Sequence, residues 1–137
     1  MDLKNAAIAI ATDDGETVSS HFGRALLYEV ITFNDGKVIE RQRREKAGHH
    51  TFAKEVTDEE HETEESHTKR HRAMVSSIPD CQAVVVRGMG QGAVDHLTQA
   101  NLLPILTSLH TIDEVIAAIG SGSLDSDPRR IHQHHAH

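Results

Sequence analysis

The chain of 137 residues has one cysteine, no tryptophan, one tyrosine and three phenylalanines. The single cysteine, Cys81, excludes an internal disulfide, and it excludes a zinc or iron–sulfur site built only from cysteines of one chain. We expect Cys81 to be a small buried residue at the entry of a strand. As a lone thiolate it could instead give one ligand to a cluster shared across a dimer.

Basic residues and long apolar runs are also scarce. The formal net charge is −7 with histidine neutral, and there is no basic stripe, which argues against nucleic acid as a partner. No window approaches a membrane span, and the apolar run near the N-terminus is too short for a signal peptide core. We therefore expect a cytoplasmic protein without a membrane partner, and the sequence leaves monomer or dimer open.

The apolar runs that are present predict an α/β domain. The run at 6–12 does not alternate with polar residues, so it fits a buried central strand. Two runs flank an Asn-Asp-Gly turn and predict a hairpin with an outer edge strand. A buried strand, a glycine-rich turn, a short helix and another strand then predict a parallel β–α–β unit. In order, the predicted hairpin strands are 25–33 and 37–43, and the later elements are a helix at 68–78, a strand at 83–86, a helix at 93–100 and a strand at 102–106.

The last predicted helix has the clearest signals. Thr111 and Glu114 have the spacing of a capping box, and Gly120 follows the last apolar residue, where a left-handed helix end is favoured. The apolar residues between them recur with helical spacing; they are Ile112, Val115, Ile116 and Ile119. Together the elements predict a single three-layer α/β domain over residues 1–124, with a mixed five-stranded sheet.

Histidine is abundant, and its distribution is uneven. Of the 12 histidines, nine lie in a middle segment and at the C-terminal end. We expect a solvated or disordered insert at about 45–67, since residues 55–65 carry seven acids and no Lys or Arg. We also expect a flexible His-rich tail at 125–137. Candidate ligands for a divalent metal in and after the insert are His49, His50, His67 and His71; a merely solvated polar segment is the alternative.

Two short motifs suggest a ligand site. The first is "SSHFGRA" (19–25), which follows the predicted central strand, and the second is the glycine-rich "RGMGQG" (87–92). Loops after such strands are where α/β sheets bind ligands, and glycines with a helix start favour an anion. The structural alternatives are an Arg24 ion pair with Asp13 or Asp14, and a tight turn with Met89 as packing. Our candidate cofactor-binding residues are Ser20, His21, Phe22, Gly23, Arg24, Gly88, Met89, Gly90 and Gly92, with His21 also a candidate metal ligand.

These motifs also carry a family resemblance. In order and spacing, "IAIATDDGETVSSHFGRA", "DCQAVVVRGMGQGA" and the capped last helix resemble the dinitrogenase iron–molybdenum cofactor biosynthesis family, the NifX-like and NifB C-terminal-like domains, over roughly residues 4–124. The resemblance implies a ribonuclease-H-like fold that binds or carries iron–sulfur-type clusters. It also implies cluster donor and acceptor proteins as partners. The chain departs from the family pattern at Arg87, where another glycine is usual, and in its acidic insert.

Three functions follow as hypotheses. The first is a carrier of an iron–sulfur or iron–molybdenum-type cluster, accessory to cofactor assembly. The alternative is a non-catalytic buffer or storage protein that binds nickel, zinc or iron through its histidines, and the third is a docking module that uses the acidic insert. We expect no enzyme, because a two-metal nuclease needs several converging carboxylates. Apart from the pair Asp13–Asp14, the predicted strands offer only Glu29 and Glu40.

Overall fold

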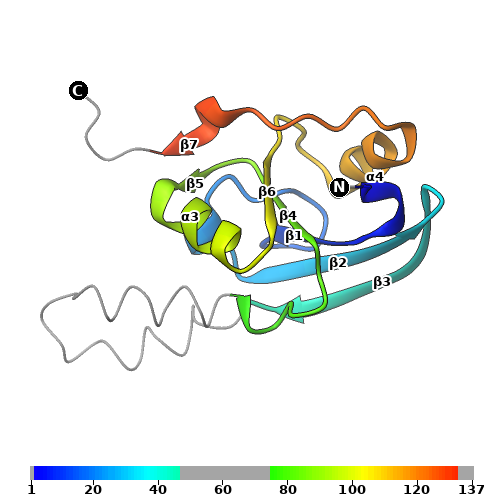
Figure 1. Cartoon of the computed structure of the whole chain (residues 1–137), viewed down its shortest axis with the longest axis horizontal. Coiled ribbons are helices and arrows are strands. Elements are labelled where there is room, and N and C mark those ends of the chain that lie inside the picture. Colours follow the sequence, from blue (N-terminus) through cyan, green and yellow to red (C-terminus); the bar gives the residue numbers. More distant parts are fainter. Residues whose placement is uncertain (1, 47–74, 133–137) are drawn as a thin grey trace, which may run out of the picture.

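The fold is built on a mixed five-stranded sheet, as the sequence predicts (Figure 1). The strands are β1 (Ala7–Thr12), β2 (Leu27–Asn34), β3 (Lys37–Glu45), β4 (Ala83–Val86) and β6 (Leu103–Leu106). A computed structural model of the protein describes residues 2–46 and 75–132. The strand order is β3-β2-β1-β4-β6; β1, β4 and β6 are parallel, and β2 runs antiparallel to both of its neighbours.

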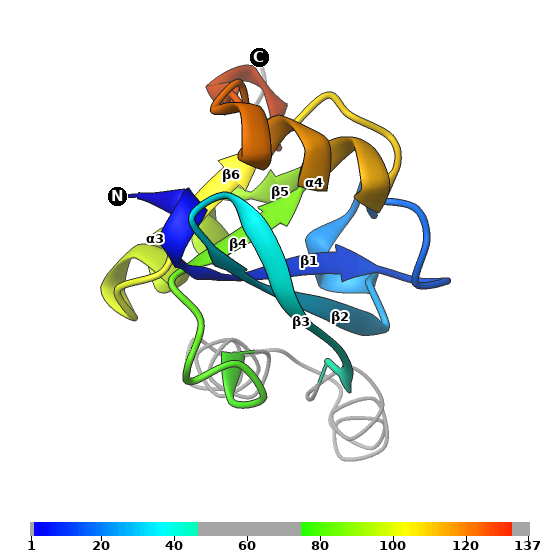
Figure 2. The same cartoon turned by 90° about the vertical axis from the view of Figure 1, so that its right-hand side faces the viewer.

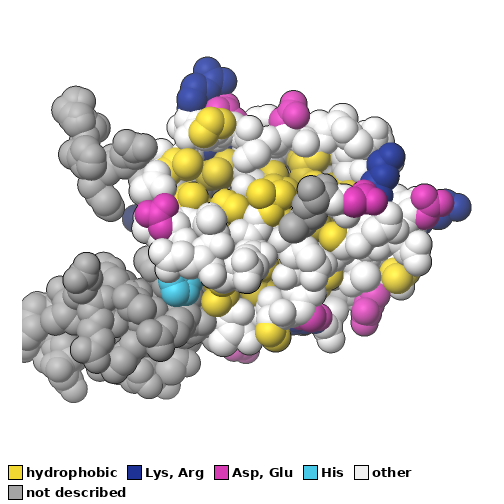
Figure 3. Space-filling view, in the orientation of Figure 1, with side chains coloured by type: hydrophobic (Ala, Val, Ile, Leu, Met, Phe, Trp, Pro, Cys, Tyr) yellow, Lys and Arg dark blue, Asp and Glu magenta, His cyan; other side chains and the backbone are white. Residues whose placement is uncertain are grey.

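Each buried strand supplies both faces of the sheet with apolar side chains. Along β1, Ile8 and Ile10 belong to one core cluster, whereas Ala9 and Ala11 belong to the other. This explains why the run does not alternate in the sequence, since successive side chains point to opposite faces and both faces are covered. In Figure 3, hydrophobic side chains gather in the centre of the face and charged ones mainly at its periphery.

In the described part of the chain one helix covers each face of the sheet, which gives three layers. Helix α3 (Gln91–Gln99) contributes Leu97 to the cluster that contains Ala9. Helix α4 (Ile112–Ser121) lies over the opposite face (Figure 2) and contributes Ile112, Val115 and Ile119 to the cluster that contains Ile8. The mixed sheet and the layered α/β architecture are confirmed.

Helix α4 begins where the sequence predicts but ends later. The Thr111 hydroxyl accepts from the Glu114 N–H at 3.1 Å, and the Glu114 carboxylate accepts from the Thr111 N–H at 3.0 Å, which completes the capping box. The prediction of a left-handed end at Gly120 is wrong, because that conformation belongs to Gly122, with φ of 75°. Gly120 has a different role: a Cβ there would lie 3.1 Å from the carbonyl oxygen of Gly36, so its absence lets the helix approach the β2–β3 turn.

The glycine-rich segment is more ordered than the predicted turn. Met89 and Gly90 form the short strand β5 (Met89–Gly90), and α3 begins at Gln91, so Gly92 lies in the first turn of the helix. Strand β5 pairs in parallel with β7 (Ile131–His132), which follows the 3-10 helix η3 (Pro128–Arg130). A non-local partner, which periodicity cannot reveal, thus replaces the expected turn.

The C-terminal segment differs from the expected flexible tail through residue 132. The Asp127 N–H donates to the carbonyl of Leu106 at 2.8 Å, and the Ser126 hydroxyl accepts from the Leu106 N–H at 3.0 Å. These bonds hold the segment on the end of β6 before β7 forms. Of the histidines in the tail, those beyond His132 lie outside the described residues, as does most of the predicted helix at 68–78. No helix in the described part of the chain is long and apolar enough to cross a membrane.

Candidate functional site

The two loop segments singled out in the sequence lie side by side. Strands β1 and β4 are parallel neighbours, so the loops that follow them leave the same edge of the sheet. Two backbone hydrogen bonds join the loops directly: the Phe22 N–H donates to the Gly88 carbonyl at 3.0 Å, and the Arg87 N–H donates to the Ser19 carbonyl at 2.8 Å. The segments 19–25 and 87–90 therefore form one continuous surface, which we call the loop pair.

The first segment is fixed by local hydrogen bonds. The Ser19 hydroxyl accepts from the His21 N–H and donates to the His21 carbonyl, each at 3.1 Å. The same carbonyl accepts from the N–H groups of Arg24 and Ala25, which closes the short helix η2 (Phe22–Arg24). This leaves His21 and Arg24 exposed on a well-defined backbone.

The neighbouring side chains divide into two groups. Ser20 and Gly23 are exposed beside His21 and Arg24. The Phe22 ring is only 2% exposed and packs against Tyr28, with ring centroids 6.4 Å apart. Phe22 therefore anchors the loop in the core, while its neighbours face outward.

The second segment also combines an anchor with accessible backbone. Met89 is 1% exposed and belongs to the core, which is the packing role that the sequence left open for it. Gly88 is buried, whereas Gly90 and Gly92 are at least partly exposed. Gly90 is the N-cap of α3 and supplies no side chain to the first N–H groups of the helix. A helix start of this kind favours negative charge.

Lys46 is a residue of this region that the sequence reasoning missed. It follows the last residue of β3, is 2% exposed, and places its Nζ 4.5 Å from the centroid of the Phe22 ring. Burial lowers the pKa of Lys46 to about 8, and the nearby carboxylate of Asp13 opposes part of that shift. No sequence signal distinguishes this lysine from an exposed one at the end of an edge strand.

The acidic side chains near the loop pair serve the backbone. Asp14 accepts from the N–H groups of Thr17 and Glu16, and these bonds lower the pKa of Asp14 to about 2. Asp13 accepts from the Leu26 N–H at 3.0 Å. Among the described residues neither aspartate forms the Arg24 ion pair that was the structural alternative for that loop.

Glu29 is the inward acid that the sequence pointed out on the hairpin. Its carboxylate is 6% exposed and accepts from Arg41 Nε at 2.6 Å and from Arg43 Nε at 3.2 Å. Glu40, on β3, is exposed. The acids of the sheet therefore do not converge on one point with Asp13 and Asp14.

Metal ligands are not clustered within the described residues. No group of three or more His, Cys, Asp or Glu side chains in residues 2–46 and 75–132 is arranged to hold a metal ion. His49, His50, His67 and His71 lie outside the described residues. Cys81 is 7% exposed; burial, with a smaller contribution from Asp80, raises the pKa of its thiol to about 11. Cys81 is therefore buried, as the sequence predicts.

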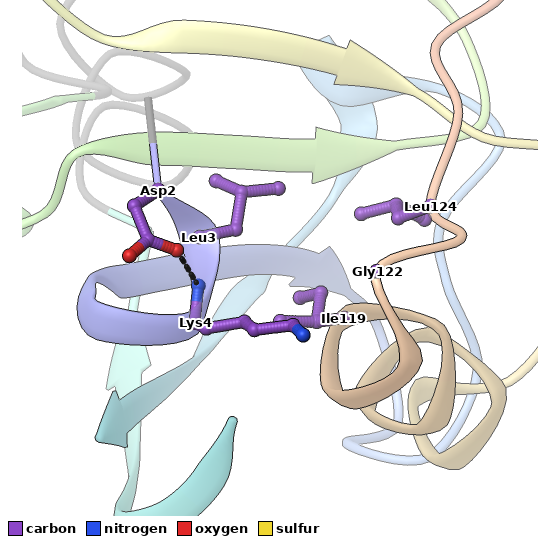
Figure 4. Close-up of a pocket in the computed structure, with 6 residues that line it drawn as sticks. All are labelled: Asp2, Leu3, Lys4, Ile119, Gly122 and Leu124. Atoms are coloured by element: carbon purple, nitrogen blue, oxygen red, sulfur yellow. Dashed lines mark hydrogen bonds between the residues drawn. The ribbon is translucent and has the colours of Figure 1, made fainter. Parts of the chain in front are cut away.

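A cavity of about 270 Å³ lies elsewhere in the fold. Figure 4 shows it between the 3-10 helix η1 (Leu3–Asn5) and the C-terminal end of α4. Its lining residues include none from the loop pair; they are Asp2, Leu3, Lys4, Ile119, Gly122 and Leu124.

Comparison with solved structures gives the same fold. The protein PH0822 is 24% identical, with a TM-score of 0.58 over 89% of this chain and 95% of that one. The apo form of the orange protein from Desulfovibrio gigas is 13% identical, with a TM-score of 0.60 over 90% and 93%. A Thermotoga protein described as a candidate NifB protein, TM1290, is 22% identical, with a TM-score of 0.57 over 88% and 92%.

The sequence comparisons identify the family. A search of curated proteins finds no match. The sequence profile described as dinitrogenase iron-molybdenum cofactor matches residues 4–122, which include the five-stranded sheet, the helices α3 and α4 and the loop pair. The chain belongs to the dinitrogenase iron-molybdenum cofactor family.

Proposed function

We propose that the protein binds an iron–sulfur or iron–molybdenum-type cluster at the loop pair and passes it on during cofactor assembly. One observation carries the proposal: the backbone bonds Phe22 N–Gly88 O and Arg87 N–Ser19 O join the two motifs at the carboxyl ends of adjacent parallel strands. This edge is where open α/β sheets bind ligands. Membership of a family named after the iron–molybdenum cofactor supports the nature of the ligand.

Several exposed groups of the loop pair would contact the cluster at the same time. His21 offers an imidazole, a ligand that suits iron, and Arg24 offers a guanidinium to an anionic cluster. The N–H groups at the start of α3 add partial positive charge. Because one histidine is a sparse ligand set, the cluster would be held loosely, which suits a carrier that must release it to an acceptor protein.

The proposal includes a non-catalytic role in the cytoplasm, with cluster donor and acceptor proteins as partners. The engaged acids argue for this role, because Asp13 and Asp14 hold the loop backbone while Glu29 is paired with two arginines. We also propose that the fold is ribonuclease-H-like, on the basis of the central β1 and the antiparallel β2-β3 hairpin beside it.

Anaerobic reconstitution with iron and sulfide tests the proposal. We expect a broad charge-transfer absorption with iron and sulfide in a fixed ratio, greatly reduced in His21→Ala. The matched control is His110→Ala, since His110 is also exposed but lies before α4. If only bare divalent metal binds and His21→Ala changes nothing, the cluster role is wrong. The His-rich segments would then make a metal buffer the better account, which replacement of His49, His50, His67 and His71 by Asn would test.

A further inference from the structure

Three buried nitrogen atoms that lack hydrogen-bond partners belong to basic residues in the loop pair or next to it. In residues 2–46 and 75–132, four buried side-chain polar atoms have no hydrogen-bond partner, and three of them belong to basic side chains. They are Lys46 Nζ, Arg87 Nε, Arg130 Nε and Ser77 Oγ. Buried polar groups are nearly always paired, so each orphan requires an explanation.

Lys46 is the most deeply buried of the three basic residues. Its backbone N–H donates to the Leu26 carbonyl at 3.0 Å, just after the first loop segment, and its Nζ lies 4.5 Å from the Phe22 ring centroid. An ammonium group has three donors to satisfy. The aromatic face offsets only part of the desolvation, since a cation–π contact is weaker than the hydration that the ammonium group loses on burial. The geometry thus keeps a costly positive charge against the residue that anchors the loop.

Arg87 is the first residue of the second loop segment, and Arg130 lies next to the strand that pairs with this segment. Arg87 directly precedes Gly88, and its backbone N–H donates to the Ser19 carbonyl at 2.8 Å. Arg130 directly precedes Ile131, which pairs with Met89 in the short parallel sheet. The chain as a whole carries a formal charge of −7, so a general excess of basic residues does not explain why these groups gather here.

We propose that the loop pair selects anions, and that Lys46 and Arg87 supply the positive charge for this selectivity. This inference rests on the proposed function and narrows it: the ligand class is a compact anion, either an oxyanion or a metal–sulfide cluster with net negative charge. An uncomplexed divalent cation would be repelled. Since charges several ångströms apart in a partly buried site still interact strongly, removing one positive charge weakens binding of a dianion by about tenfold.

Molybdate, a tetrahedral dianion, is a probe that needs no reconstituted cluster. The full-length apo protein is labelled with ¹⁵N and titrated with sodium molybdate at constant ionic strength, and sodium sulfate is titrated in parallel to separate oxyanion binding in general from a preference for molybdate. The amides to follow are those of Gly23, Gly88 and Gly90. The variants are Lys46→Met and Arg87→Gln. Lys37→Met is the matched control, because it removes the same charge from the exposed opposite end of β3.

We expect molybdate to shift these amides in the wild type and in Lys37→Met with equal affinity, and to bind Lys46→Met and Arg87→Gln about tenfold more weakly. If Lys46→Met does not fold, two other measurements test the proposal. Molybdate should shift the ¹³Cε resonance of Lys46 in the wild type, and Arg87→Gln should bind molybdate more weakly. The proposal is wrong if neither dianion moves the three amides, or if neither loop variant loses affinity. In that case reconstitution with iron and sulfide would still test the carrier function separately. Conversely, failed reconstitution with intact anion binding would overturn only the carrier function.

Discussion

Replacing Glu29 by Gln tests whether the most deeply buried acid of the sheet is structural. Glu29 lies opposite Arg43 in the β2–β3 register, and Arg41, two residues along, shares that face. The bonds of 2.6 and 3.2 Å hold both guanidinium groups in place. Arg41 also donates to the Gly15 carbonyl at 3.3 Å, and Arg43 fills the space where a Cβ of Gly15 would stand. The two arginines that Glu29 holds therefore support the turn that leads into the first loop segment.

The magnitude follows from the burial of the three side chains. Removing one partner of a fully buried ion pair costs about 3–5 kcal/mol. The carboxylate is 6% exposed, but Arg41 and Arg43 are 37% and 55% exposed, so water can solvate them once the charge is gone. We therefore expect Glu29→Gln to lower the free energy of unfolding by about 2–3 kcal/mol.

Urea denaturation at neutral pH, with linear extrapolation, measures this loss. Glu40→Gln is the control, because Glu40 is an exposed acid on β3 and its replacement should change the free energy of unfolding by less than about 0.5 kcal/mol. An unchanged or increased stability of Glu29→Gln would show that the ion pairs of Glu29 do not stabilise the fold. It would indicate instead a strained carboxylate kept for chemistry, as active-site acids often are.

Three further predictions concern Lys46, Cys81 and Thr111. The pKa of Lys46 falls from 10.5 to about 8 on folding, so between these pH values the unfolded chain binds a proton that the folded chain has lost. On raising the pH from 8 to 10.5, the free energy of unfolding of the wild type should therefore rise by about 3 kcal/mol relative to that of Lys46→Met. Parallel plots of this free energy, from urea denaturation, against pH would contradict the prediction. The pKa of Cys81 is raised to about 11, so iodoacetamide at pH 8 should alkylate it about 100-fold more slowly than a short cysteine peptide; a peptide-like rate under native conditions would disprove the buried thiol. Thr111→Ala removes one half of the capping box and should lower the free energy of unfolding by about 1 kcal/mol, whereas Thr111→Ser should be nearly neutral; equal losses in thermal or urea unfolding would count against the cap.

Local patterns were sufficient for most of the fold. The apolar run of β1, the Asn-Asp-Gly turn of the hairpin and the capping box of α4 each depend on residues close in sequence. The end of α4 could not be predicted in the same way, because Gly120 and Gly122 look alike to a sequence argument. Only the approach of Gly36 to Gly120 shows which of them is needed for close packing.

The candidate site was predictable only in its backbone. Parallel pairing of β1 with β4 brings the two motifs together, whereas the predicted β–α–β unit implied only that β4 and β6 are parallel. The pairing of Met89 with Ile131 and the burial of Lys46 against Phe22 join segments far apart in sequence. Such contacts leave no periodic signal, so the positive charge of the site could not be predicted.

The most direct test of a cluster at the loop pair is paramagnetic broadening of NMR signals in the anaerobically reconstituted protein. A bound iron–sulfur cluster broadens nearby resonances, and the apo spectrum serves as the reference. We predict that signals of His21, Gly88 and Gly90 are lost while that of Val115, in the helix on the opposite face, stays sharp. Uniform broadening, or sharp loop signals with losses elsewhere, would contradict the account.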